Sequence, residues 1–109
     1  MSNRLFQGII HQMKDAVDRT IGVIDETSVV IACSDLGKIG EVDESINSET
    51  LVNSSPFVTG GFTYKSFGSA NRAEYAVFVS GNDDYAQKCA NMLAISLTNI
   101  KQYYDEKYD

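Results

Sequence analysis

The spacing of apolar residues predicts a helix at each end of the chain. From residue 3 to residue 19, apolar side chains recur every three or four positions, which is the period of one helix face. They are Leu5, Phe6, Ile9, Ile10, Met13, Ala16 and Val17. Residues 84–106 predict a second, longer helix with a seam of alternating four- and three-residue steps, as in a coiled coil. The seam consists of Ala86, Ala90, Leu93, Leu97, Ile100 and Tyr104.

Two β-hairpins are predicted between these helices. Residues 21–25 and 29–34 are rich in β-branched side chains and flank a turn-prone stretch, which is typical of a hairpin. Residues 29–33 have almost no polar side, so we expect the strand to be covered on both faces. Residues 62–67 and 74–80 predict the second hairpin.

Residues 35–59 show the least regular pattern. Pro56 prevents a helix at its own position, and the apolar anchors of the segment are Leu51, Val52, Phe57 and Val58. We expect Asp35 to cap a short turn and Asp83 to cap the last helix. The predicted fold class is α+β. An antiparallel sheet of four or five strands has the first and last helices on one face, and residues 35–59 cover the other.

Composition limits the function. A chain of 109 residues suits a single domain spanning residues 1–109. The net charge is −6 and the nine basic residues are scattered, which argues against direct nucleic-acid binding. There is no apolar run of signal-peptide or membrane-span length, so we expect a cytoplasmic protein without a membrane partner. Cys33 and Cys89 lie in apolar stretches and are predicted to be buried thiols, although sequence leaves a disulfide open.

Catalytic and metal motifs are missing from the sequence. His11 is the only histidine, and no nucleophile, base or cysteine accompanies it at a known spacing. The glycines form neither a phosphate-binding loop nor a dinucleotide fingerprint. We therefore predict a protein that is not an enzyme and that uses no cofactor and no metal.

One segment resembles a known family. Residues 21–41, IGVIDETSVVIACSDLGKIGE, are similar to the sensor-domain hairpin of bacterial sugar-diacid-regulator and PucR-like transcription factors. Ser28 stands where that family has a turn glycine. The matching positions are Val23, Asp25, Val30, Ile31, Ala32, Ser34, Asp35, Lys38, Ile39 and Gly40. Residues 75–86 also resemble the last strand and the start of the final helix in PAS-like and GAF-like domains.

The resemblance implies a role as well as a PAS/GAF-like fold. The chain would be the N-terminal sensory domain of a helix-turn-helix transcriptional regulator, with helix 84–106 cut before a DNA-binding domain that is missing here. DNA would be contacted only through that domain. The family suggests a sugar diacid as effector, but the acidic balance and the lack of paired arginines argue against it.

Two sets of residues are the candidate functional positions. For a small-molecule effector held beneath residues 35–59, the candidates are Ser34, Thr63, Tyr64 and Tyr75; alternatively, the tyrosines simply fill the core. For a homodimer, the candidates are Phe6, Ile10, Met13, Leu93, Leu97, Ile100 and Tyr104. The alternative function is a roadblock/profilin-like docking scaffold without a ligand, since that class shares a similar order of elements.

Overall fold

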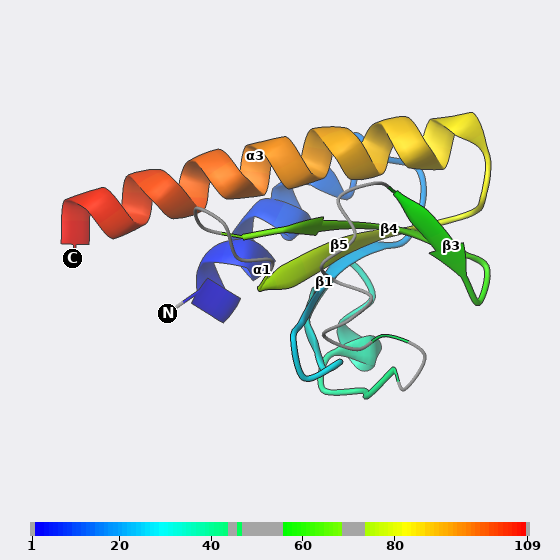
Figure 1. Ribbon diagram of the computed structural model, residues 1–109, viewed down its shortest axis with the longest axis horizontal. Coiled ribbons are helices and arrows are strands. Elements are labelled where there is room, and N and C mark those ends of the chain that lie inside the picture. The colour runs from blue at the N-terminus through cyan, green and yellow to red at the C-terminus, as the bar shows by residue number, and fades with distance from the viewer. Residues whose placement is uncertain (1, 44–45, 47–55, 69–73, 109) are drawn as a thin grey trace.

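A sheet of five antiparallel strands forms the centre of the protein (Figure 1). The computed structural model describes residues 2–43, 46, 56–68 and 74–108. The strands are β1 (Ile21–Asp25), β2 (Val30–Cys33), β3 (Phe57–Thr59), β4 (Phe62–Phe67) and β5 (Tyr75–Ser80). Their order across the sheet is β2-β1-β5-β4-β3. The helices are α1 (Ser2–Met13), the 3-10 turn η1 (Leu36–Lys38) and α3 (Asp84–Tyr108).

One face of the sheet is covered by both long helices, as predicted. α1 lies against β1 and β2, and α3 crosses β4 and β5. Phe6 of α1 and Leu97 of α3 are fully buried in this layer, against Val77 and Val79 of the central strand. Figure 1 shows the C-terminal turns of α3 extending past the end of the strands. The α+β fold class is confirmed.

The opposite face has its own apolar cluster. Ile24, Val30, Tyr64 and Phe78 belong to it, and Ile46, from the irregular segment, is 1% exposed there. Figure 1 shows η1 and the residues that follow it on this side of the sheet, away from α3. The described part of the irregular segment therefore covers the face that was predicted. The expected anchors Leu51 and Val52 lie outside the described residues.

The end of the irregular segment differs from expectation. Phe57 and Val58 were expected in the loop, but they form strand β3, which pairs with β4 across the turn at Gly60 and Gly61. Both glycines have positive φ angles, of 60° and 82°, which side chains with a Cβ rarely adopt. The second predicted hairpin is thus preceded by a shorter one, and the sheet gains its fifth strand.

Strand β2 is an edge strand that is nevertheless buried. Its residues are at most 8% exposed. The Cys33 backbone N–H donates to Oε1 of Gln7 at 2.8 Å, and Nε2 of Gln7 donates back to the Cys33 carbonyl at 3.2 Å. Further along, the Val30 N–H donates to the Glu41 carbonyl at 2.9 Å, and the Gly40 N–H donates to the Val30 carbonyl at 2.8 Å. A side-chain amide and a returning loop therefore satisfy an edge that would otherwise be open to strand pairing.

The first helix is shorter than predicted. The apolar spacing continues to Val17, but α1 ends at Met13 and residues 14–19 form turns and bends. The chain must reverse here to enter β1 at Ile21. Arg19 marks the reversal, because its guanidinium forms two hydrogen bonds with the Asp83 carboxylate, at 2.6 and 2.8 Å. Asp83 also accepts from the Ala86 N–H at 3.1 Å, which confirms it as the N-cap of α3.

Candidate functional site

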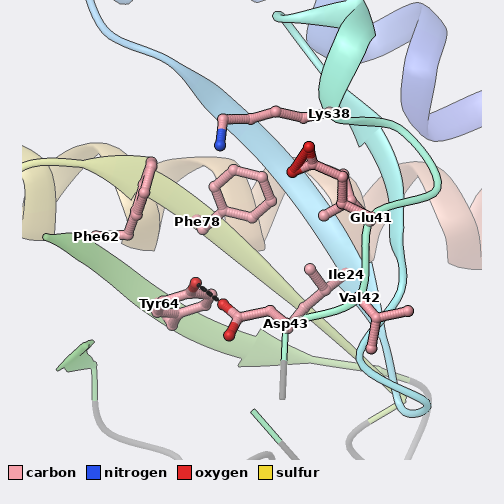
Figure 2. A pocket seen from close by; sticks show the side chains of 9 residues that line it. Ile24, Lys38, Glu41, Val42, Asp43, Phe62, Tyr64 and Phe78 are labelled. Carbon is pink, nitrogen blue, oxygen red and sulfur yellow. Dashed lines mark hydrogen bonds between the residues drawn. The ribbon is translucent and has the colours of Figure 1, made fainter. Parts of the chain in front are cut away.

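A hollow of about 500 Å³ opens on the sheet face opposite the two long helices (Figure 2). Its floor comes from β1, β2, β4 and β5, and its rim comes from the end of η1 and the loop that follows. The described residues that line it are Ile24, Val30, Lys38, Glu41, Val42, Asp43, Phe62, Tyr64 and Phe78. The volume lies in the range of small-molecule sites, which is about 300–1,000 Å³.

Aromatic rings form much of the floor. The rings of Phe62 and Phe78 meet edge to face with centroids 5.6 Å apart, and Tyr64 lies 5.9 Å from Phe78. On its other side Tyr64 stacks on Phe57 at 5.3 Å. These residues alternate along β4 and β5, so that one face of each strand supplies the rings.

Gly22 gives Phe78 the space it occupies. The two residues are paired across β1 and β5. A Cβ built on Gly22 would collide with the Phe78 ring and would lie 2.6 Å from the Ala32 carbonyl oxygen. A residue without a side chain is therefore required here for a large ring to lie flat across the neighbouring strand.

The hydroxyl of Tyr64 is fixed by Asp43. It donates to Oδ2 of Asp43 at 2.7 Å, as Figure 2 shows. Burial, followed by this hydrogen bond and the negative charge of Asp43, raises the pKa of Tyr64 above its usual value. Tyr64 is thus a neutral donor at physiological pH, and it ties the loop to the floor.

Lys38 and Glu41 bring charge to the rim. The carboxylate of Asp35 accepts from the Gly37 N–H at 3.1 Å and caps η1, as predicted for Asp35. η1 ends at Lys38, whose Nζ lies 5.4 Å from the centroid of the Phe62 ring. In Figure 2 the Lys38 and Glu41 side chains occupy the upper rim, and the Tyr64–Asp43 pair lies below them.

The β1–β2 turn holds the loop in place. Ser28 has a φ of 70°, a left-handed conformation that residues other than glycine rarely adopt. Its hydroxyl donates to the carbonyl of Ile46, and its own carbonyl accepts from the Asp43 N–H at 2.8 Å. Val29 and Val42 form an isolated antiparallel bridge. The loop that forms the rim is therefore attached by backbone hydrogen bonds as well as by side chains.

The structure places only one of the four predicted ligand residues in the hollow. Tyr64 lines it. Thr63 is fully buried on the helix-covered face and donates to the Gly81 carbonyl at 2.8 Å. Tyr75 packs against Phe6 with ring centroids 5.0 Å apart. Ser34 lies at the other end of β2, where its hydroxyl accepts from the Ile21 N–H at 3.1 Å.

Strand periodicity explains this separation. Side chains alternate between faces, so Thr63 and Tyr64 cannot face the same way. Tyr75 pairs with Phe67, which is three residues from Tyr64 and hence on the opposite face. Five further residues that line the hollow were not predicted as ligand residues from the sequence: Lys38, Glu41, Asp43, Phe62 and Phe78. Because side chains alternate along a strand, Phe62 shares a face with Tyr64 and could have been predicted from it. Lys38 could have been singled out because it lies in the segment that carries the family resemblance.

The predicted dimer residues are mostly core residues. Phe6, Ile10 and Leu97 are fully buried and Leu93 is 2% exposed, all within the layer between helices and sheet. For these four residues the assignment was wrong, because they pack between the helices and the sheet of their own chain. Met13, Ile100 and Tyr104 remain half-buried.

Other apolar side chains of α3 are exposed instead. Tyr85, Met92, Ile95 and Tyr103 are between 44% and 67% exposed. With 3.6 residues per turn, Tyr85, Met92 and Tyr103 lie along one line on the outer side of the helix, with Ile95 beside it. We call these four residues the outer stripe.

The remaining candidate groups are accounted for. Cys33 and Cys89 are both buried, as predicted, but in clusters on opposite faces of the sheet. His11 is exposed on α1. Within the described ranges, no three His, Cys, Asp or Glu side chains gather in a way that could hold a metal. None of the described helices combines the length and apolarity needed to cross a bilayer.

Comparison with known proteins gives no relative. The chain significantly matches no protein-family model, no curated protein and no solved structure. The resemblance to PucR-like sensor domains therefore stays a prediction that depends on residues 21–41, and the function has to be argued from the site.

Proposed function

We propose that this protein is a small-molecule-sensing domain whose ligand occupies the hollow between the sheet and the loop of residues 38–43. The observation that carries the proposal is the composition of that hollow. Aromatic and aliphatic side chains form a floor, and a few charged and hydrogen-bonding groups converge at its rim, as in small-molecule sites generally.

The loop is well placed to report a bound ligand. It is attached to the edge strand β2 and to the β1–β2 turn by backbone hydrogen bonds. β1 in turn pairs with the central strand β5, against which α3 packs. A ligand that binds one arrangement of this loop better than another would shift the population of the arrangements. In a larger regulator, α3 would carry that change to an attached output domain, such as the DNA-binding domain that the family resemblance implies.

A cytoplasmic location belongs to the same proposal. Both cysteines are buried thiols without a disulfide. This suits a reducing compartment, where small intracellular sensors work.

The test fills the hollow without disturbing the core. Glu41 is exposed and its side chain points into the hollow (Figure 2), so Glu41→Trp should occupy the hollow while the chain still folds. Val58 is 45% exposed on β3 and lies outside the hollow, which makes Val58→Trp the matched control. We expect at least one pool of a metabolite library to raise the melting temperature of the native chain and of Val58→Trp, but not of Glu41→Trp. A library that moves none of the three, or moves all three equally, would contradict the proposal.

The second candidate function is protein docking without a ligand, and the outer stripe favours it. Its four large side chains are exposed on one helix, and apolar side chains gathered on a surface are typical of protein interaction sites. A homodimer through the outer stripe would agree with the predicted dimerisation, although its interface residues would differ from those predicted. Met92→Glu should abolish self-association seen by light scattering if the stripe is the interface, whereas Gln87→Glu, which is exposed on another side of the same helix, should leave it intact. A monomeric native chain would remove the homodimer from this candidate.

A further inference from the structure

The hollow carries charges of both signs on an apolar floor. One ammonium, that of Lys38, and two carboxylates, those of Glu41 and Asp43, line it together with Phe62 and Phe78. Within the described part of the chain, no ion pair joins Lys38 to Glu41, although they are only three positions apart. Lys38 instead holds its ammonium over the Phe62 ring.

Ligands that carry charge of a single sign fit this set poorly. A dicarboxylate would bring its charges beside Glu41 and Asp43, where like charges repel in a partly desolvated site. An organic cation would be drawn to the aromatic faces, but the Lys38 ammonium already lies over one of them. An uncharged apolar ligand would remove water from Lys38 and Glu41 without replacing their hydrogen bonds, which is costly.

A ligand with both charges gives Lys38 and Glu41 a partner each. Its carboxylate can accept from Lys38, and its ammonium can donate to Glu41, with Asp43 and its Tyr64 partner on the far side of the cavity (Figure 2). Such contacts are charge-assisted and stronger than neutral hydrogen bonds. The floor of Phe62, Phe78 and Ile24 then favours an apolar or aromatic side chain on the ligand.

We propose that the hollow binds a free α-amino acid with an apolar or aromatic side chain, held by Lys38 at its carboxylate and by Glu41 at its ammonium. This inference depends on the proposed sensing function, because it names the ligand class of the same hollow. It replaces the sugar diacid that the family resemblance implied.

The experiment uses three probes of nearly equal shape with the full 109-residue chain. L-Phenylalanine carries both charges, 2-phenylethylamine only the ammonium, and 3-phenylpropanoate only the carboxylate. We expect calorimetric titration to show that L-phenylalanine binds tightest and that each half-charged probe binds about tenfold or more weakly, since each loses one charge-assisted contact. Equal binding of L-phenylalanine and either half-charged probe would overturn the assignment.

Two variants assign the groups and separate a binding role from a merely structural one. Lys38→Gln should weaken L-phenylalanine and 3-phenylpropanoate but leave 2-phenylethylamine unchanged. Glu41→Gln should weaken L-phenylalanine and 2-phenylethylamine but leave 3-phenylpropanoate unchanged. Lys88→Gln, on the exposed side of α3, is the control and should change none of the three. A variant that weakened all three probes equally would count against the assigned contacts.

The outcomes distinguish this inference from the proposed function. If none of the probes binds but a metabolite of other chemistry stabilises the native chain and not Glu41→Trp, the amino-acid assignment fails and the sensing function stands. If no metabolite stabilises the chain in a way that Glu41→Trp removes, both fail.

Discussion

At the scale of single residues, the site depends on a glycine outside the hollow. Gly22 lies on β1 beneath Phe78, whose ring forms part of the floor. A β-carbon there would meet both the ring and the backbone of β2. Because the obstacle on one side is a carbonyl oxygen, repacking of side chains alone cannot relieve it.

The first prediction follows from this contact. Gly22→Ala should lower the free energy of unfolding by about 1–3 kcal/mol through overpacking, measured by urea denaturation. Gly8→Ala is the matched control, because Gly8 is exposed in α1 and a Cβ there would meet nothing within 4 Å. It should instead stabilise the chain by about 0.5–1 kcal/mol, the helix-propensity difference. Equal effects of the two substitutions would show that Phe78 does not lie where the structure places it.

At the scale of elements, the junction of β1, β5 and α3 is held by one ion pair. Arg19 bonds to both oxygens of Asp83, and its guanidinium also lies 4.8 Å from the centre of the Tyr85 ring. The hydrogen bond from Arg19, followed by that from the Ala86 N–H, lowers the pKa of Asp83 below its ordinary value of 3.8. The folded state therefore holds the proton on Asp83 less tightly than the unfolded chain does.

The second prediction concerns the loss of stability of the folded chain at acidic pH. Because the pKa of Asp83 is lower in the folded chain than in the unfolded chain, its ionised carboxylate stabilises the fold. This stabilisation is fully present above the unfolded pKa, about pH 4, and is lost as the pH falls below it. Asp83→Asn keeps a capping oxygen for Ala86 but loses the ion pair, so it should reduce stability at pH 7 and flatten the loss on acidification. Asp84→Asn removes the same charge one residue later and serves as the control. If Asp83→Asn lost stability on acidification as steeply as the native chain does, this role would be contradicted.

The third prediction distinguishes the inner from the outer side of α3. Leu97 is fully buried and Met92 is 67% exposed on the same helix. Leu97→Ala should cost about 2–5 kcal/mol of unfolding free energy through the cavity it leaves. Met92→Ala should cost no more than about 0.5 kcal/mol. If Leu97→Ala instead halved the mass in light scattering and left stability unchanged, the seam would be an intermolecular interface after all.

At the scale of the whole molecule, the sequence predicted the layers better than the site. Period-2 and helical spacing identified both long helices, four strands and the coverage of both sheet faces. The same seam of α3 that packs on the sheet was assigned to a dimer, because periodicity shows that Leu93 and Leu97 need a partner surface without showing which surface it is. The three-residue strand β3 was missed because it is too short to show a period.

The site was harder to predict because it depends on contacts between distant segments. Tyr64 was identified from its strand, but its partner Asp43 is 21 positions away and is placed by a loop of no regular pattern. Lys38 reaches the floor only because Asp35 caps a short turn and because the loop is attached to β2. Sequence spacing describes neither of these long-range constraints.

The most direct test of the account is an amide chemical-shift map of the ¹⁵N-labelled chain, titrated with whichever metabolite stabilises it. We expect the shifts to concentrate at residues 38–43 and at Tyr64 and Phe78, and we expect Glu41→Trp to abolish them while Val58→Trp does not. Shifts confined to the outer stripe of α3, with none around the hollow, would contradict the proposed sensing site.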